Sequence, residues 1–185
     1  MQTALRLIFW GLVLLLIDVK LDNVDILNDI AGYLVIFAGL RELARVDVAF
    51  EYAKPFAAGG AVAAAVITFA GPSNWATDAI SALIDGLLVW TICTGIIRIA
   101  LPAGHAMLAE AARVRRNWNV IAVVIGAAAS VIGYYVPMTL PWILIPAIIF
   151  GFIIGALVLH LLWRAGDALA QPPLIPRSPA ADAVP

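Results

Sequence analysis

The chain has 185 residues, of which 64% are hydrophobic and only 12% are charged, and its formal net charge is −1. An ordinary soluble domain is about 45–50% apolar and about 25% charged, so a water-soluble fold of this composition would lack the polar residues to cover its surface. The near-neutral charge offers no basic field for nucleic acid, and the single cysteine excludes an intramolecular disulfide and a thiolate metal cluster, so we expect lipid to surround most of the chain.

The first expected helix, residues 3–21, begins like a secretory signal, because Arg6 precedes an apolar run over residues 7–17. No small-x-small cleavage pattern follows that run, and Asp18 and Lys20 come instead. We therefore expect this segment to be retained as a helix.

Five further stretches have about the 20 mainly apolar residues that a helix needs to cross a bilayer. Together with the first, they predict an all-α membrane protein, a bundle of six transmembrane helices arranged as three hairpins in one domain, residues 1–170. Pro137 and Pro141 mark the turn between the last two helices, because proline disfavours helix in the residue before it. The Pro-rich tail, residues 171–185, is expected to be disordered. The five stretches are residues 24–43, 55–71, 75–101, 118–136 and 141–163.

The basic residues predict the orientation of this bundle, because Lys and Arg accumulate in cytoplasmic segments beside membrane spans. If the amino terminus is cytoplasmic, ten of the eleven basic residues fall on that side and only Lys20 lies outside. Both chain ends are then cytoplasmic. Residues 41–54 and 104–117 are expected to extend helices into the cytoplasm, the first as far as Pro55. The ten are Arg6, Arg41, Arg45, Lys54, Arg98, Arg113, Arg115, Arg116, Arg164 and Arg177.

Four carboxylates cluster around the expected first outer turn. Asp18, Asp22, Asp25 and Asp29 follow one another at spacings of four, three and four residues, which would stack them on one face of a continuous helix. A hairpin must turn near Asp22, so we expect Asp18 on the first helix and Asp25 and Asp29 on the second. A fifth carboxylate, Asp85, lies within the fourth span, where an idle charge costs about 2.5–3.5 kcal/mol.

These carboxylates predict a binding site near the outer side of the bundle. We expect Asp85 to face the bundle interior and to share an outward-facing acidic pocket with Asp29 and Asn28, with Asp18 and Asp25 at its rim. Oxygen ligands of this kind suit a cation, an ammonium group or a transferable proton, and the sequence does not specify a metal. The alternative is that these groups cap helices, pair with the neighbouring lysine or contact lipid headgroups.

Small residues predict close contacts between helices. Gly151 and Gly155 form a pair at i, i+4 on the last helix, and Gly59 and Gly60 begin a run of small residues on the third. Such surfaces let helix backbones approach closely, either inside the bundle or against a second membrane protein or another copy of the chain. No phosphate loop, nucleophile elbow or paired-histidine zinc motif is present in the sequence, so we expect no catalytic residue and no cofactor.

The stretch over residues 24–33 resembles the first-hairpin motif of small uncharacterised bacterial multi-pass membrane proteins. That motif has an acidic residue, then usually proline and aspartate, then glycine and tyrosine, which here are Asp25, Asn28, Asp29, Gly32 and Tyr33. Asn28 stands where proline is usual. The resemblance implies the inner, cytoplasmic membrane of a bacterium and carries no activity.

Three functions remain open from the sequence. An accessory or assembly subunit of a larger membrane complex accounts for the small size, the small-residue helix faces and the absence of a loop that could hold a catalytic domain. A small transporter or binding protein for a cation or an amine accounts for the acidic outer side. An intramembrane enzyme that uses carboxylates as acid and base is third, because neither a nucleophile nor a metal site is evident.

Overall fold

The computed structural model describes residues 1–16, 26–70, 75–135 and 140–170, and these residues form six α-helices and no strand. The all-α class and the number of helices agree with the sequence prediction. The expected outer turns near Asp22, Ser73 and Met138, and the tail over residues 171–185, lie outside the described residues. The helices are α1 Gln2–Leu16, α2 Ile26–Leu43, α3 Val48–Ala70, α4 Trp75–Ala100, α5 Ala106–Tyr135 and α6 Leu140–Ala168.

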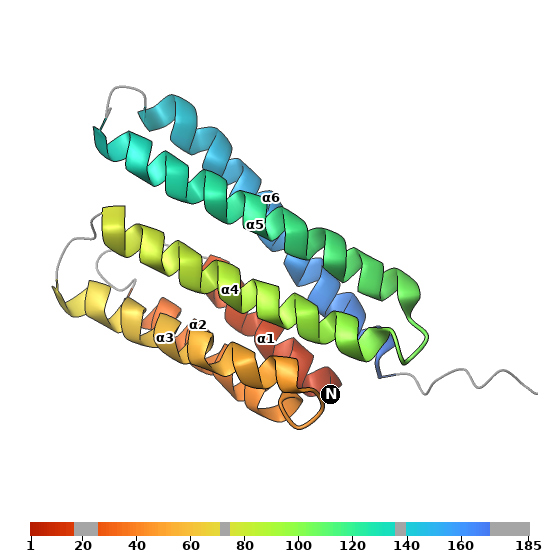
Figure 1. The fold of residues 1–185 in the computed structure, drawn as a ribbon. Helices are drawn as coiled ribbons and strands as arrows, with labels where there is room; N and C mark the ends of the chain where they lie inside the picture. Colours follow the sequence, from red (N-terminus) through yellow and green to blue (C-terminus); the bar gives the residue numbers. More distant parts are fainter. Residues whose placement is uncertain (17–25, 71–74, 136–139, 171–185) are drawn as a thin grey trace, which may run out of the picture.

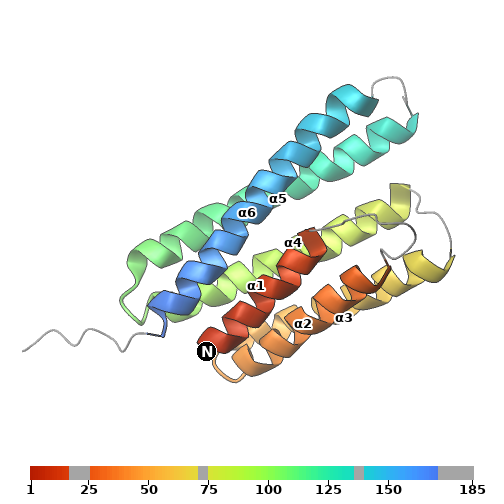
Figure 2. The ribbon, with the colours of Figure 1, turned by 180° about the vertical axis from the view of Figure 1, so that it is seen from behind.

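The six helices form a closed ring in which each helix packs on its neighbours in the chain and α6 returns to α1. The start of α1 and the end of α6 lie at one end of the bundle, which we call the terminal end, together with the α2–α3 and α4–α5 turns (Figures 1 and 2). Toward the opposite end, α5 and α6 separate as a pair from the other four helices (Figures 1 and 2). The ring is therefore tight at the terminal end and opens at the other.

The core is packed most closely between α1 and α2, because glycines let the two backbones approach. A Cβ at Gly11 would lie 2.7 Å from the carbonyl oxygen of Gly32, and a Cβ at Gly39 would lie 2.7 Å from the carbonyl oxygen of Ala4. Any larger residue at these positions would force the helices apart. Large buried side chains around this contact and across the ring include Leu5, Ile8, Ile36, Leu40, Phe50, Ile92, Ile96, Leu161 and Leu162.

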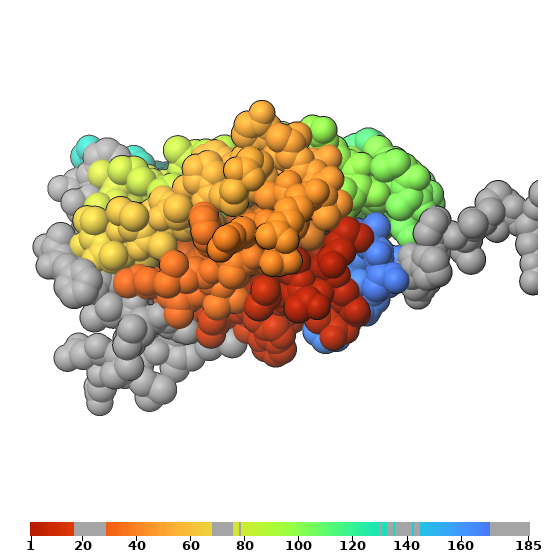
Figure 3. Space-filling view, turned by 90° about the horizontal axis from the view of Figure 1, so that it is seen from below, coloured from red at the N-terminus to blue at the C-terminus, as the bar shows by residue number. Residues whose placement is uncertain are grey.

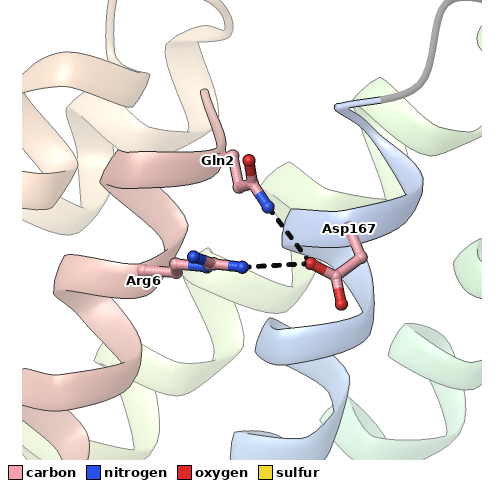
Figure 4. Close-up of polar contacts among 3 residues, drawn as sticks. All are labelled: Gln2, Arg6 and Asp167. Atoms are coloured by element: carbon pink, nitrogen blue, oxygen red, sulfur yellow. Dashed lines mark hydrogen bonds and ion pairs between the residues drawn. The ribbon is translucent and has the colours of Figure 1, made fainter.

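Polar side chains close the ring at the terminal end. In the space-filling view the start of α1 lies against the end of α6 (Figure 3). There Gln2 Nε2 and Arg6 Nη2 both donate to Asp167 Oδ1, at 3.2 and 3.4 Å (Figure 4). Four ion pairs that join two described side chains belong to this end: Arg6–Asp167, Lys54–Glu51, Arg98–Asp47 and Arg113–Glu110. Such exposed pairs each contribute about 0–1 kcal/mol, so they orient the helix ends more than they stabilise the bundle.

The start of α3 differs from the sequence prediction. We expected one helical extension over residues 41–54 that stops at Pro55, whereas α2 ends at Leu43 and α3 runs through Pro55. The reason is a helix cap: Asp47 Oδ1 accepts a hydrogen bond from the backbone N–H of Ala49 at 2.8 Å, which starts α3 before the proline. Pro55 then removes one backbone hydrogen bond within the helix without ending it.

Two of the described helical segments are long and apolar enough to cross a membrane, by length and composition. They are residues 79–100 of α4 and residues 145–168 of α6. The other described helices do not meet both criteria, and α1 is a shorter apolar helix of 15 residues. In α2, the three charged side chains of Asp29, Arg41 and Glu42 interrupt the apolar sequence.

Candidate functional site

The site is built around Asp85, which α4 places between two different environments. On one side, Tyr33 of α2 donates a hydrogen bond from Oη to Asp85 Oδ1 at 2.5 Å. On the other side, Asp85 lines a cavity and is therefore only half-buried. Tyr33 itself is 6% exposed, so this hydrogen bond is shielded from solvent. The Asp85 carboxylate therefore accepts a hydrogen bond from Tyr33 and also faces the cavity.

A glycine on α3 makes room for Tyr33. A Cβ at Gly60 would overlap the aromatic ring of Tyr33, so only glycine allows the ring to lie between α2, α3 and α4. The sequence prediction assigned Gly60 to helix packing, and here the glycine accommodates a side chain that reaches a third helix. The position of the hydroxyl that binds Asp85 therefore depends on a residue from the second hairpin.

Asp29 joins the same group of side chains. It lies four residues before Tyr33 on α2, so both side chains project from the same side of the helix. Asp29 acts electrostatically on both Tyr33 and Asp85. Asp29 of the first hairpin therefore lies on the same face of α2 as Tyr33, whose hydroxyl donates to Asp85 of the second hairpin.

The cavity in front of Asp85 has a volume of about 320 Å³ and lies between α1, α4, α5 and α6. Asp85 and Asn119 supply the polar side chains of its wall. Asn119, on α5, is 9% exposed and donates from Nδ2 to the backbone oxygen of Gly86 at 3.0 Å, which fixes α5 beside Asp85. The remaining wall is apolar or glycine and includes Leu12, Leu15, Leu16, Leu88, Val123, Gly126, Gly151, Ile154, Gly155 and Val158.

The cavity differs from the expected acidic pocket. Asp29 is not among the described residues that line the cavity, so Asp85 is the one carboxylate among them. Asp18 and Asp25 lie outside the described residues. Asn28 belongs to α2, but the structure does not describe its side chain. The contribution of Asp18, Asp25 and Asn28 to a binding site stays a prediction.

Of the four glycines predicted at helix contacts, the structure places two in contacts and two in open space. A Cβ at Gly155 would lie 3.1 Å from Leu16 Cδ1, so Gly155 lies at the α1–α6 contact, and Gly60 contacts Tyr33 as described. A Cβ at Gly59 or at Gly151 would meet no described atom within 4 Å. Gly151 instead lines the cavity in front of Asp85, and a helix contact at Gly59 or Gly151 stays a prediction.

Two side chains of the site were not assigned to it from the sequence. Tyr33 was noticed only through the motif resemblance, although its spacing of four residues from Asp29 is a signal that both face one side of a helix. Asn119 is an amide at the start of a long uncharged run, and a polar side chain there is expected to find a partner inside the bundle.

The chemistry of the site follows from these few groups. Within the described part of the chain, no three His, Cys, Asp or Glu side chains lie close enough together to hold a metal ion. A carboxylate with one phenol donor and an adjacent amide can neutralise one positive charge or accept one proton. The apolar wall can cover the uncharged part of a bound molecule.

No protein-family model, curated protein or solved structure matches the chain. The resemblance of residues 24–33 to small bacterial membrane proteins therefore stays a prediction.

Proposed function

We propose that the protein is a six-span membrane protein whose cavity binds a small organic cation, such as an amine with an apolar body, through the carboxylate of Asp85. This proposal rests on the position of Asp85. Its carboxylate accepts a hydrogen bond from Tyr33 and lies in the wall of a cavity that is apolar apart from Asp85 and Asn119. A carboxylate in such a place has a large electrostatic preference for a positive partner, because the surrounding dielectric constant is low.

The distribution of apolar and charged side chains supports the membrane part of the proposal. Four ion pairs that join described side chains lie at the terminal end, whereas α6 presents large apolar side chains on the outer surface of the bundle along its first half. A contiguous apolar surface of this kind is unfavourable in water and favourable in lipid. The exposed side chains, each at least half exposed, are Ile145, Ile148, Ile149, Phe152 and Ile153.

The orientation follows from the same distribution. Both described chain ends lie at the terminal end, as an even number of spans requires (Figures 1 and 2). The basic side chains at that end, including Arg6, Arg98 and Arg113, favour the cytoplasmic side. The proposal therefore places both termini in the cytoplasm of a bacterium and the wide end of the ring toward the outside of its inner membrane.

The composition of the cavity wall favours an organic cation over a bare metal ion. Ca²⁺ takes about 6–8 oxygen ligands, and Mg²⁺ is held in a near-octahedral shell that includes several waters. The wall offers the carboxylate of Asp85 and the amide of Asn119, and the rest is hydrocarbon or glycine. A volume of about 320 Å³ is at the low end of the range of about 300–1,000 Å³ for small-molecule sites. An ammonium group with a short apolar body matches both the charge and the lining.

A second candidate function, an accessory or assembly subunit of a membrane complex, is favoured by Gly59 on α3. A Cβ at this position would meet no described atom within 4 Å, so described side chains leave the helix backbone uncovered there. A helix of another membrane protein, or of a second copy of this chain, could approach closely at this position. This function does not require the cavity to bind a ligand.

Thermal unfolding of the full-length protein in a neutral detergent tests the first proposal. A ligand present at 100 times its Kd stabilises the folded state by about 2.7 kcal/mol, so primary alkylamines of increasing chain length should raise Tm of the wild type above that in sodium chloride. Asp85→Asn should remain folded and lose the amine-dependent rise. Asp167→Asn, which removes an exposed carboxylate at the terminal end, is the control and should keep it.

The outcomes separate the two candidates. Equal amine-dependent shifts in the wild type and in Asp85→Asn, or no shift with any amine, would exclude the cation site. A purified mass that includes an unrelated membrane protein would then favour the accessory subunit.

A further inference from the structure

A second cavity shares Asn119 and Val123 with the first and is otherwise lined by residues of α4 and α5 that do not line the first. It is a groove of about 200 Å³ between α4 and α5, and apolar side chains form most of its wall. On α4, Leu83, Leu87 and Trp90 follow at spacings of four and three residues, and on α5, Val120 and Val124 are spaced by four, so each set lies along one helix face. Leu83 and Val124 are 54% and 62% exposed, so the groove is open along its length.

One end of this groove carries a guanidinium group. The Cζ atom of Arg116 lies 4.3 Å from the centre of the Trp90 ring, and its Nη1 donates to Thr94 Oγ1 at 3.3 Å. Arg116 is one helical turn before Val120 on α5, and Thr94 is one turn after Trp90 on α4. Because the two helices are antiparallel, both positions lie at the end of the groove nearer the terminal end of the bundle (Figure 1).

Arg116 differs from the neighbouring arginines in the groups that it contacts. Arg113 forms an ion pair with Glu110 at 2.8 Å, and Arg115 Nε donates to the backbone oxygen of Leu157 at 2.7 Å. In the part of the chain that the structure describes, Arg116 has no carboxylate partner and its buried Nε has no hydrogen-bond partner. A positive charge without a counter-ion therefore stands at the end of an apolar groove.

We infer that this groove binds one acyl chain of an anionic phospholipid, whose headgroup phosphate pairs with Arg116. The inference rests on the membrane insertion in the proposed function but not on the cation site. From Arg116 to Val124, α5 rises by about 12 Å. This rise is close to the thickness of one leaflet, about 15 Å of a hydrocarbon core of about 30 Å. Arginine at the depth of the headgroups attracts anionic lipid, and the groove supplies the apolar surface that the acyl chain contacts.

The shape and charge of the groove specify this occupant. The ligand must be negatively charged at one end and apolar along its length, and its charge must lie at the cytoplasmic headgroup level. An anionic phospholipid meets all three requirements. A second copy of the chain would have to bring a carboxylate to Arg116 and would cover Leu83 and Val124 together, which changes the mass of the purified particle.

The test is native mass spectrometry of the full-length protein in a neutral detergent with equal amounts of phosphatidylglycerol and phosphatidylcholine that have the same acyl chains. The wild type should retain phosphatidylglycerol preferentially. Arg116→Gln should reduce that retention about tenfold, the change expected when one charge-assisted contact is removed. Arg113→Gln, which removes an arginine from the same helix, is the matched control and should leave retention unchanged.

Two further variants separate the groove from folding and from the cation site. Val124→Trp fills the groove at an exposed position without touching Arg116, and it should lower lipid retention while leaving Tm close to that of the wild type. Asp85→Asn should retain the lipid like the wild type, so failure of the cation site does not affect this result. If Arg116→Gln does not fold, two other results test the inference: the lipid retention of Val124→Trp, and the preference of the wild type for phosphatidylglycerol over phosphatidylcholine.

The inference is overturned if the wild type retains both lipids alike, or if Arg113→Gln loses as much retention as Arg116→Gln. It is also overturned if glycerol phosphate, which has the phosphate but no acyl chain, displaces the lipid. A dimer in the wild type that becomes a monomer in Val124→Trp would assign the groove to a second copy of the chain instead.

Discussion

Tyr33 and Asp85, 52 residues apart in the sequence, are joined by a hydrogen bond of 2.5 Å from the Tyr33 hydroxyl to Asp85 Oδ1. This bond links α2 to α4 across the ring and fixes the carboxylate at the wall of the cavity. The same carboxylate that would bind the ligand is thus also a structural contact between two hairpins. Changes at Tyr33 and at Asp85 should therefore affect stability and ligand binding together.

The first prediction is energetic coupling between these two residues. Removing one partner leaves the other unsatisfied, so Tyr33→Phe and Asp85→Ala should each lower the free energy of unfolding by about 1–3 kcal/mol. The double variant should lose less than the sum of the two single variants, because the second change removes nothing further from the bond. Denaturant unfolding of the four proteins measures the coupling. Additivity within about 0.5 kcal/mol would contradict the bond.

The second prediction compares two adjacent glycines. Gly60→Ala should lower the free energy of unfolding by about 1–3 kcal/mol, because the new Cβ would overlap the ring of Tyr33. Gly59→Ala should be neutral or slightly stabilising, because its Cβ would meet no described atom and alanine favours helix. Thermal unfolding in one detergent compares them directly. Similar decreases in the free energy of unfolding of both variants would show that the ring of Tyr33 does not lie against Gly60.

The third prediction separates two roles of Asp47, which caps α3 and pairs with Arg98 at 3.1 Å. Asp47→Asn keeps a side-chain oxygen that can cap the helix and removes the charge, so it should cost less than about 1 kcal/mol. Asp47→Ala removes the cap as well and should cost about 1–2 kcal/mol. Unfolding measurements distinguish the two. A larger decrease in the free energy of unfolding for Asp47→Asn than for Asp47→Ala would contradict the capping role of Asp47.

The fourth prediction concerns topology. Cysteines at Gly104, in the α4–α5 turn, and at Ser73, in the expected outer turn, should react with an impermeant thiol reagent from opposite sides of the membrane. A Cys93→Ala background removes the native thiol, which is buried. Inverted and right-side-out vesicles provide the two sides. Labelling of both positions from the same side would contradict the six-span arrangement.

Much of the fold was predictable because long apolar runs bounded by polar residues specify helices locally. The prediction of residues 75–101 agrees closely with α4, Trp75–Ala100, and the described part of the chain forms six helices, the number predicted. The start of α3 was missed, because the cap by Asp47 outweighs the signal of Pro55 as a helix stop. Single residues of this kind move a helix boundary without changing the apolar pattern.

The site was predictable in part, for a different reason. The position of Asp85 deep in an apolar run predicted that it faces the bundle interior, where it now lines the cavity. The hydrogen bond from Tyr33 depends on how helices far apart in sequence pack, and no local pattern specifies that packing. The same holds for Gly60, whose role depends on a ring contributed by another helix, and for Asn119, which binds the backbone of α4.

The central claim, that Asp85 binds a cation in the cavity, is tested most directly by chemical labelling of its carboxyl group. A lipophilic carbodiimide adds to carboxyl groups in apolar surroundings, and mass spectrometry of the digested protein locates the adduct. Labelling of the wild type should occur at Asp85, should be absent in Asp85→Asn, and should fall in proportion to the occupancy of an added quaternary alkylammonium ion, which the activated carboxyl cannot acylate. Labelling of Asp85 that is unchanged by a saturating quaternary alkylammonium ion would contradict the account.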